Sequence, residues 1–317
     1  MGVIWDLVTS LTMESYPPRP IFTLQDVPDL SGKVFIVTGG NSGIGFETVK
    51  ELVTHGARVF MASRSRSKAE EAIASITKDT GKSPIFLELD LADLVSVQKA
   101  ARIFLEKETR LDVLYNSAGI MIPPIEQITQ QGYDMQFGLV LGHFYLTKLL
   151  LPIMISTAKS SPNGKARVVN VSSGAHHFCG LDFPSFKDGA ARRKRTTHAL
   201  YAQSKFGMVV LTAELAKRYG DQGIVSLALN PGNVATPLQR EIQGFQRTVT
   251  SFILYPVRPL GIITHMWAGT AAETAEYNGK YLRPWARLGA PRQDTQDPEL
   301  GRRLWNWLED QVQGVTE

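Results

Sequence analysis

The segment from Val34 to Gly56 constrains the fold more than any other part of the chain. Val34 to Val37 is an apolar run of β-branched and aromatic residues, and glycines follow at positions 39, 43 and 45. Such a run suits a strand that is buried on both faces. Apolar side chains then recur with helical spacing as far as Val53, and Gly56 stands where a helix would end. We therefore predict a strand, a glycine-rich turn and a helix.

This order of elements predicts a binding site for a dinucleotide. Glycines have no Cβ atom, so backbone N–H groups can approach a pyrophosphate, and the dipole at a helix N-terminus favours its negative charge. The alternative is an ordinary glycine-rich turn. A second strand pattern at Arg58–Met61 supplies the context that favours the dinucleotide site.

The rest of the chain alternates strand patterns with helix patterns. This alternation predicts an α/β fold of the Rossmann type, a doubly wound parallel sheet of about seven strands with helices on both faces. We expect an N-terminal extension over residues 1–30, a catalytic domain over 31–285 and a helical tail over 286–317. The further strands are expected at 84–89, 111–115, 167–171, 224–229 and 280–282, and the helices at 68–76, 95–105, 133–156 with an interruption at Pro152, 202–218 and 297–312.

Composition narrows the classes of partner. The net charge of +4 is too small and too dispersed to predict binding to nucleic acid. Cys179 is the single cysteine, which excludes an internal disulfide and favours a reducing compartment such as the cytoplasm. No apolar run approaches the roughly 20 residues of a membrane span. We expect the N-terminal segment Met1–Ser15 to form a helix that lies on the fold, with peripheral contact to a membrane surface as the alternative.

Two smaller features of the sequence have ordinary interpretations. The adjacent His176 and His177 lack a third ligand at useful spacing, so we predict loop residues and no metal site. The basic run Arg192–Arg195 is expected to be a solvated loop, with contact to an anionic membrane as the alternative.

The best candidates for catalysis are Tyr201 and Lys205. Four residues apart on a helix, their side chains share a face, and a nearby cation favours the phenolate and lowers the pKa of a tyrosine. Such a pair can act as a general acid and base, although an exposed pair without a function is the common alternative. Two strand ends favour the catalytic interpretation. Ser172-Ser173 and Asn230-Pro-Gly both stand where strands should reach the carboxyl edge of the sheet, at which open α/β folds bind ligands.

In combination, these motifs resemble the short-chain dehydrogenase/reductase superfamily, especially its retinol-dehydrogenase-like and fungal reductase members. The resemblance covers about residues 31–285. It implies that Ser173 hydrogen-bonds the substrate carbonyl, that Tyr201 transfers the proton, and that Lys205 binds the nicotinamide ribose and lowers the tyrosine pKa. The motifs that carry it are Thr38-Gly-Gly-Asn-Ser-Gly-Ile-Gly45, Asp90-Leu91, Asn116-Ser-Ala-Gly119, Ser172-Ser173, Tyr201 to Lys205, and Pro231-Gly232 with Thr236.

The same resemblance implies a set of cofactor-binding residues in addition to Tyr201 and Lys205. The glycine-rich turn would hold the pyrophosphate, two loops would surround the adenosine, and the loop after the sixth strand would contact the nicotinamide. These residues are Gly39, Asn41, Ser42, Gly43, Ile44 and Gly45 in the turn, Asp90, Leu91, Asn116, Ala118 and Gly119 around the adenosine, and Pro231, Gly232, Val234 and Thr236 at the nicotinamide.

The residues after the second strand predict NADP(H) as the cofactor. A site for NAD usually places an acidic residue there to bind the ribose 2′-hydroxyl. This chain has Ser63 and Arg64 instead, with Arg66 and Lys68 close by. A guanidinium fits a 2′-phosphate well. The alternative is that Arg64 is a solvated loop charge.

One departure from the family's pattern leaves the chemistry open. Related sequences carry a catalytic asparagine between Gln-Phe-Gly and Gly-His-Phe, and this asparagine helps to hold a water beside the lysine. Here the interval between Gln136 and Phe144 is one residue shorter and contains no asparagine. His143 and Gln136 are candidate substitutes. The alternatives are a working oxidoreductase, a slowed one, a non-redox enzyme such as an isomerase or cyclase, and a protein that binds NADP(H) without catalysis.

The segment from Phe252 to Ile263 suggests the class of substrate. It is apolar and interrupted by prolines, and in this family it would cover the nicotinamide as a lid. That composition predicts a lipophilic substrate, such as a terpenoid, a retinoid-like molecule or an aromatic ketone or aldehyde, in a reaction of secondary metabolism. The resemblance also implies a homo-oligomer formed through the long helices.

Overall fold

The centre of the molecule is one sheet of eight strands, seen in a computed structural model that describes residues 2–235 and 254–315, with side chains from residue 9 onward. The strand order is β3-β2-β1-β4-β5-β6-β7-β8. The predicted doubly wound α/β fold is therefore confirmed. The strands are β1 (Val34–Thr38), β2 (Arg58–Ser63), β3 (Ile85–Glu88), β4 (Val113–Asn116), β5 (Ala166–Val171), β6 (Ile224–Leu229), β7 (Tyr281–Arg283) and β8 (Arg287–Gly289).

All neighbouring strands from β3 to β7 pair in parallel, and only β8 runs antiparallel, against β7. Every residue of β1, β4, β5 and β6 is buried, as expected for parallel strands covered on both faces. Strand order reverses direction at β1 and β4, so the carboxyl ends of these two strands open a crevice for a ligand.

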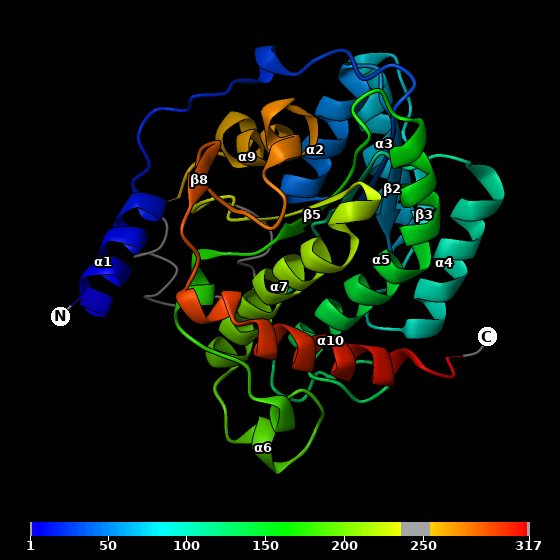
Figure 1. Cartoon of the computed structure of the whole chain (residues 1–317). Helices are drawn as coiled ribbons and strands as arrows, with labels where there is room; N and C mark the ends of the chain where they lie inside the picture. Colours follow the sequence, from blue (N-terminus) through cyan, green and yellow to red (C-terminus); the bar gives the residue numbers. More distant parts are fainter. Residues whose placement is uncertain (1, 236–253, 316–317) are drawn as a thin grey trace.

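Long helices cover both faces of the sheet (Figure 1). On one face lie α4 (Leu94–Lys107), α5 (Met135–Ser160) and α7 (Thr197–Tyr219). On the other lie α2 (Gly43–Thr54), α3 (Arg66–Thr80) and α9 (Ile262–Thr270). The short helices are η1 (Leu24–Asp26), η2 (Gly174–His177), η3 (Phe183–Ser185), α6 (Ala190–Arg193), η4 (Gly220–Gln222), η6 (Val257–Gly261), η7 (Glu273–Glu276) and η8 (Gln293–Gln296).

The two ends of the chain both pack on this core. The C-terminal helix α10 (Pro298–Val312) runs across α7 and α5 and buries Leu304, Trp305 and Leu308 (Figure 1). The N-terminal helix α1 (Gly2–Ser15) meets the fold at its C-terminal end, beside η2. The predicted tail 286–317 thus supplies both the edge strand β8 and the covering helix α10.

Two local predictions were wrong, and one strand was missed. The edge strand β8 was not predicted, because Arg287–Gly289 contains one apolar side chain and no run of them. The long helix α5 is not interrupted at Pro152, which lies on its exposed side, where water can bond the carbonyl that loses its N–H partner. The basic run is not fully solvated, because the Arg192 side chain is buried, donates to the Ile125 carbonyl and lies 3.7 Å from Asp134 Oδ2.

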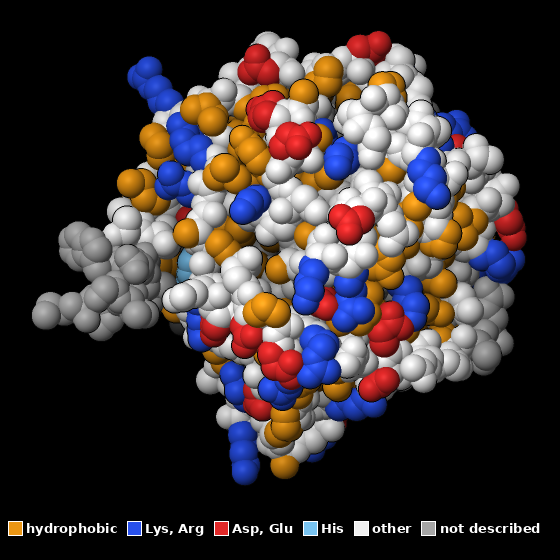
Figure 2. Space-filling view, viewed as in Figure 1, with side chains coloured by type: hydrophobic (Ala, Val, Ile, Leu, Met, Phe, Trp, Pro, Cys, Tyr) orange, Lys and Arg blue, Asp and Glu red, His pale blue; other side chains and the backbone are white. Residues whose placement is uncertain are grey.

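Among the described helices, α5 alone is long and apolar enough to cross a membrane by length and composition, and most of it is buried inside this fold. On the face seen in Figure 2, basic and acidic side chains are interspersed over α10 and its surroundings. Ion pairs such as Arg302–Glu299 and Lys148–Glu309 join them.

Candidate active site

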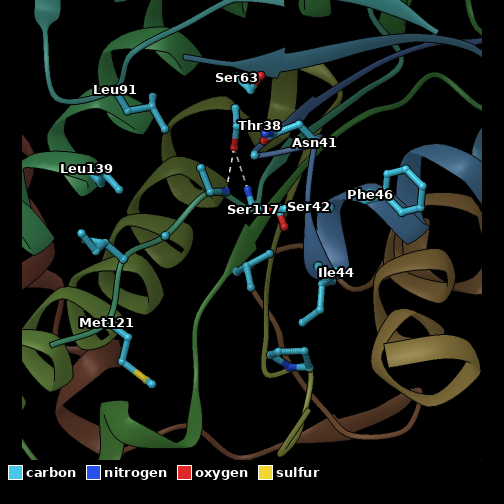
Figure 3. A pocket seen from close by; sticks show the side chains of 18 of the residues that line it. Thr38, Asn41, Ser42, Ile44, Phe46, Ser63, Leu91, Ser117, Met121 and Leu139 are labelled. Atoms are coloured by element: carbon cyan, nitrogen blue, oxygen red, sulfur yellow. Dashed lines mark hydrogen bonds between the residues drawn. The ribbon is translucent and has the colours of Figure 1, made fainter. Parts of the chain in front are cut away.

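A pocket of about 920 Å³ runs along the carboxyl edge of the sheet. Its wall begins at the turn after β1, passes the ends of β2 and β3, and reaches the loops after β4, β5 and β6. Figure 3 shows Ile44 and Phe46 on one side of this pocket, and Leu91 and Leu139 on the other. The strand ends that the sequence singled out therefore do lie on one cavity.

The turn between β1 and α2 can be built only from glycines at its critical positions. Gly39 and Gly43 have φ angles of +69° and +55°, a left-handed conformation that side chains disfavour. A Cβ on Gly45 would lie 2.3 Å from the Gly39 carbonyl oxygen. The turn therefore brings bare backbone and the N-terminus of α2 to the pocket, an arrangement suited to a pyrophosphate.

Thr38, at the end of β1, ties this turn to the loop after β4. Its Oγ1 accepts hydrogen bonds from the N–H groups of Ser117 and Ala118, each 2.9 Å long (Figure 3). Nε2 of the buried His143 lies 2.9 Å from the same oxygen. Burial, reinforced by the charge of Lys205, lowers the pKa of His143 to about 3, so this imidazole is neutral. The network fixes two walls of the pocket against each other.

The end of the pocket beside β2 and β3 fits the adenosine half of a dinucleotide phosphate. Arg64, Lys68 and Glu71 line it, together with Asp90 and Leu91. The buried Ser63 Oγ faces this region without a hydrogen-bond partner, so a ligand atom could satisfy it. The charged side chains of this wall are therefore two cations, Arg64 and Lys68, and two acids, Glu71 and Asp90. Arg66, by contrast, lies over the Phe86 ring and pairs with Glu88 at 3.3 Å.

The opposite end holds Ser173, Tyr201 and Lys205, which come from the end of β5 and from α7. The Ser173 hydroxyl hydrogen-bonds the Tyr201 hydroxyl. Lys205 Nζ lies 5.7 Å from the centre of the Tyr201 ring and donates to the Val171 carbonyl at 3.1 Å. Ser172 anchors α7 here, since its Oγ donates to the Lys205 carbonyl at 2.7 Å. A proton donor, a second hydroxyl and a cation thus meet at one place.

The protonation of this trio differs in part from the sequence-based expectation. Burial raises the pKa of Tyr201 to about 12, and the hydrogen bond from Ser173 opposes that rise. Burial also lowers the pKa of Lys205 to about 8. At neutral pH the tyrosine is therefore a protonated acid beside a lysine that is still mainly charged.

The helix α5 has no asparagine near Lys205, and neither candidate substitute takes its place. Gln136 Oε1 accepts from the Ile122 N–H, and Gln136 Nε2 donates to the Thr197 carbonyl. His143 is engaged by Thr38. A cavity of about 10 Å³, room for about one water, does lie beside Lys205, with Gln136, His143 and Ser204 also in its wall.

The structure brings most of the predicted cofactor-binding residues to the large pocket. Asn116 is an exception, because its buried amide donates to Thr147 Oγ1 and Asn170 Oδ1 between β4, β5 and α5. Thr236 lies outside the described residues. The pocket wall contains Gly39, Asn41, Ser42, Gly43, Ile44, Gly45, Arg64, Asp90, Leu91, Ala118, Gly119, Tyr201, Lys205, Pro231, Gly232 and Val234, together with Ser173.

The sequence did not predict the apolar wall near Tyr201 or the burial of the two histidines. Ile120, Met121, Met135 and Leu139 line the pocket, but they come from a loop and a helix start without a motif. His176 and His177, predicted as loop residues, are buried in the short helix η2. Of the predicted lid, Phe252 and Ile253 lie outside the described residues, and Leu254 lines the pocket.

Comparison with known proteins agrees with this geometry. Residues 33–186 match the model of the short chain dehydrogenase family. A short-chain dehydrogenase/reductase of Armillaria gallica is 50% identical over 312 residues, which cover 98% of this chain and 99% of the relative. The chain belongs to the short-chain dehydrogenase/reductase family. It is therefore an oxidoreductase that uses a nicotinamide cofactor.

Solved structures of the same fold include one complex with NADH and one with NADP. A 3-ketoacyl-(acyl-carrier-protein) reductase of Brucella melitensis, complexed with NADH, is 24% identical with a TM-score of 0.62, and the match covers 80% of this chain and 96% of that one. The RhlG/NADP complex of Pseudomonas aeruginosa is 23% identical with a TM-score of 0.59, and the match covers 84% and 97% of the two chains. These likenesses show the fold.

Proposed function

We propose that this short-chain dehydrogenase/reductase interconverts a carbonyl and an alcohol on a lipophilic small molecule, with NADP(H) as its cofactor. The observation that carries the proposal is the meeting of Ser173, Tyr201 and Lys205 at one end of a pocket whose other end suits a phosphorylated adenosine. A proton donor placed at one end of a dinucleotide cleft is what carbonyl reduction requires.

Each side chain of the trio has a distinct role. The bound cofactor would supply or accept the hydride. In reduction, the Tyr201 hydroxyl donates its proton to the carbonyl oxygen and becomes a phenolate. The Ser173 hydroxyl, already within hydrogen-bond reach of Tyr201, donates to the same oxygen. The Lys205 ammonium, 5.7 Å from the ring centre, stabilises the phenolate that forms.

The high pKa of Tyr201 suits the reductive direction. With a pKa of about 12, nearly every Tyr201 carries its proton at neutral pH. Oxidation of an alcohol needs the phenolate, which becomes more abundant as pH rises. We therefore propose that Tyr201 enters carbonyl reduction as a protonated acid at neutral pH.

The preference for NADP(H) rests on Arg64 and Lys68, which line the adenosine end of the pocket. Replacing Arg64 by Asp should weaken NADPH binding by roughly 10- to 100-fold, because a charged hydrogen bond is lost and a repulsive carboxylate is added. The matched control is Arg66→Asp, since Arg66 pairs with Glu88 instead of lining the pocket. Unchanged NADPH affinity in Arg64→Asp, measured by titration, would refute the preference.

The lipophilic substrate is inferred from the wall beside the trio. Ile120, Met121, Met135, Leu139 and Leu254 line the same pocket, and Ile120 and Leu139 also border the small cavity beside Lys205. An apolar wall with a few converging polar groups is typical of sites for apolar ligands. Terpenoid, retinoid-like and aromatic ketones or aldehydes, as found in secondary metabolism, are the classes that we propose.

The decisive experiment follows NADPH oxidation by the wild type and by Tyr201→Phe on a panel of lipophilic ketones and aldehydes. We expect the variant to lose roughly 10²- to 10⁴-fold in turnover while its NADPH affinity is preserved. Tyr219→Phe is a matched control at the far end of the same helix. Equal turnover in Tyr201→Phe would remove the proposed acid. Tight NADPH binding without turnover would favour the non-redox or non-catalytic alternatives.

We also propose the setting in which the protein acts. With Cys179 free and no second cysteine in the chain, a reducing compartment such as the cytoplasm suits it. We retain peripheral membrane contact as an alternative. A homo-oligomer, which the family resemblance implies, would have to use a surface other than α5 and α7, where α10 already packs.

A further inference from the structure

Glu14, near the end of α1, is an acidic residue buried beside the candidate active site. Its side chain is only 4% exposed. Acidic side chains are rarely buried to this extent without partners. The first 30 residues precede the dinucleotide-binding core. A buried acid in this segment therefore needs partners from other parts of the fold.

The Glu14 carboxylate accepts hydrogen bonds from the carboxyl edge of the sheet. Its Oε2 accepts from Asn230 Nδ2 at 2.7 Å. Both oxygens accept from the Tyr281 hydroxyl at 3.1 Å, and His177 Nε2 lies 3.4 Å from Oε1. Asn230 directly follows β6, Tyr281 begins β7 and His177 ends η2. One side chain therefore connects three segments that are far apart in the sequence.

The bond to Asn230 reaches the proposed nicotinamide end of the pocket. With its N–H₂ group held by Glu14, Asn230 must turn its oxygen the other way. There Oδ1 accepts from the Gly232 N–H at 2.9 Å. Asn230, Pro231 and Gly232 all line the pocket. Glu14 therefore fixes the orientation of the amide that holds this turn.

Two more contacts attach the same region to the catalytic edge. His176, whose ring packs at a tilt between those of His177 and Tyr281, donates from Nδ1 to the Ser173 carbonyl at 2.7 Å. The Ser15 carbonyl accepts from the Tyr255 hydroxyl at 3.3 Å, and the Tyr255 N–H donates to the Asn233 carbonyl at 2.7 Å. The end of α1 thus touches segments next to both Ser173 and the loop after β6.

We propose that Glu14 is a positioning residue, through which α1 holds Asn230 and the Pro231–Gly232 turn in place for the nicotinamide half of the cofactor. The adenosine half, at the far end of the pocket, lies outside its reach. The consequences for turnover rest on the proposed function, but those for cofactor binding do not.

The test compares two probes, NADPH and 2′,5′-ADP, the second of which lacks the nicotinamide half. In Glu14→Ala, the NADPH dissociation constant should rise by about fivefold to tenfold, whereas that of 2′,5′-ADP should stay as in the wild type. Turnover should fall at saturating NADPH. Met13→Ala is the matched control, since Met13 is the neighbouring residue on α1 and is 43% exposed.

If Glu14→Ala does not fold, an exchange of the carboxylate and the amide between positions 14 and 230 provides a second test. Asn230→Asp should weaken NADPH binding, because two carboxylates would then face each other. Adding Glu14→Gln should restore it, because the new amide can donate to Asp at position 230 while the other oxygen still accepts from Gly232. No recovery in the double variant, or equal weakening of both probes, would overturn the proposal. Absence of carbonyl turnover in the wild type would refute the proposed reaction and leave the comparison of probes valid.

Discussion

At the scale of single residues, Lys205 is the group whose charge should set the upper pH limit of carbonyl reduction. Burial lowers its pKa to about 8, so the ammonium is present below that pH and is lost above it. The charged form is the one that stabilises the phenolate of Tyr201. We therefore expect kcat/KM for reduction to be level below about pH 8 and to fall roughly tenfold per pH unit above it.

The measurement is a pH profile of kcat/KM for the wild type and for Lys205→Arg. A guanidinium stays charged throughout this range, so the alkaline decline should be absent from the variant even where its overall rate is lower. The same decline in both proteins would assign it to another group. Tyr201 is a poor candidate for it, because its pKa of about 12 lies well above the range.

Single residues also show where sequence reasoning succeeds and where it stops. Tyr201 and Lys205 were predictable because helical spacing alone places them on one face. Asn116 was not, because the amide of a strand-end residue can face either the ligand or the neighbouring strand, and here it bonds Asn170. Glu14 gave no signal, since its partners are brought together only by the fold. The raised pKa of Tyr201 likewise depends on burial that no local pattern records.

At the scale of elements, the amphipathic helix α10 should contribute strongly to stability. Its buried side chains recur at positions 304, 305, 308 and 312, and Leu308 is fully buried. Leu308→Ala leaves a cavity in this layer and should lower the free energy of unfolding by about 2–5 kcal/mol. Asn306→Ala, on the exposed face of the same helix, should change it by less than about 0.5 kcal/mol. Urea unfolding of the two variants gives the comparison, and similar values would show that α10 is not part of the cooperative core.

Elements of helical or buried-strand periodicity were largely predictable, and the exceptions have physical causes. The strands β1, β2, β4, β5 and β6 are largely apolar runs of four to six residues, and their burial leaves a clear pattern in the sequence. β8 has three residues and exists because it pairs with β7 at the sheet edge. The helix α5 passes through Pro152 because neighbouring turns pack against the core and the proline faces solvent. Neither property is local in the sequence.

At the scale of the whole molecule, α10 bears on how copies of the chain can associate. The family resemblance implies an oligomer formed through the long helices, of which α5 and α7 are the longest here. In this chain the Trp305 ring meets Phe144 of α5 at 5.0 Å between ring centres, and the Arg218 guanidinium of α7 lies over Trp305 at 4.5 Å. A Cβ on Gly301 would lie 2.9 Å from Glu214 Oε2, so α10 sits close against α7. A second copy could reach these faces only by displacing α10.

We therefore expect no contact between copies through α5 and α7, whatever the mass in solution. Light scattering coupled to size-exclusion chromatography gives that mass against the 35.0 kDa of one chain. Crosslinking with mass spectrometry then locates any interface. Leu308→Asp, which places a charge beneath α10, should loosen the helix, expose the apolar face of α7 and increase association with protein concentration. Crosslinks that join α7 of one wild-type copy to α7 of another would contradict the expectation, because such contacts require a surface that α10 covers within each chain.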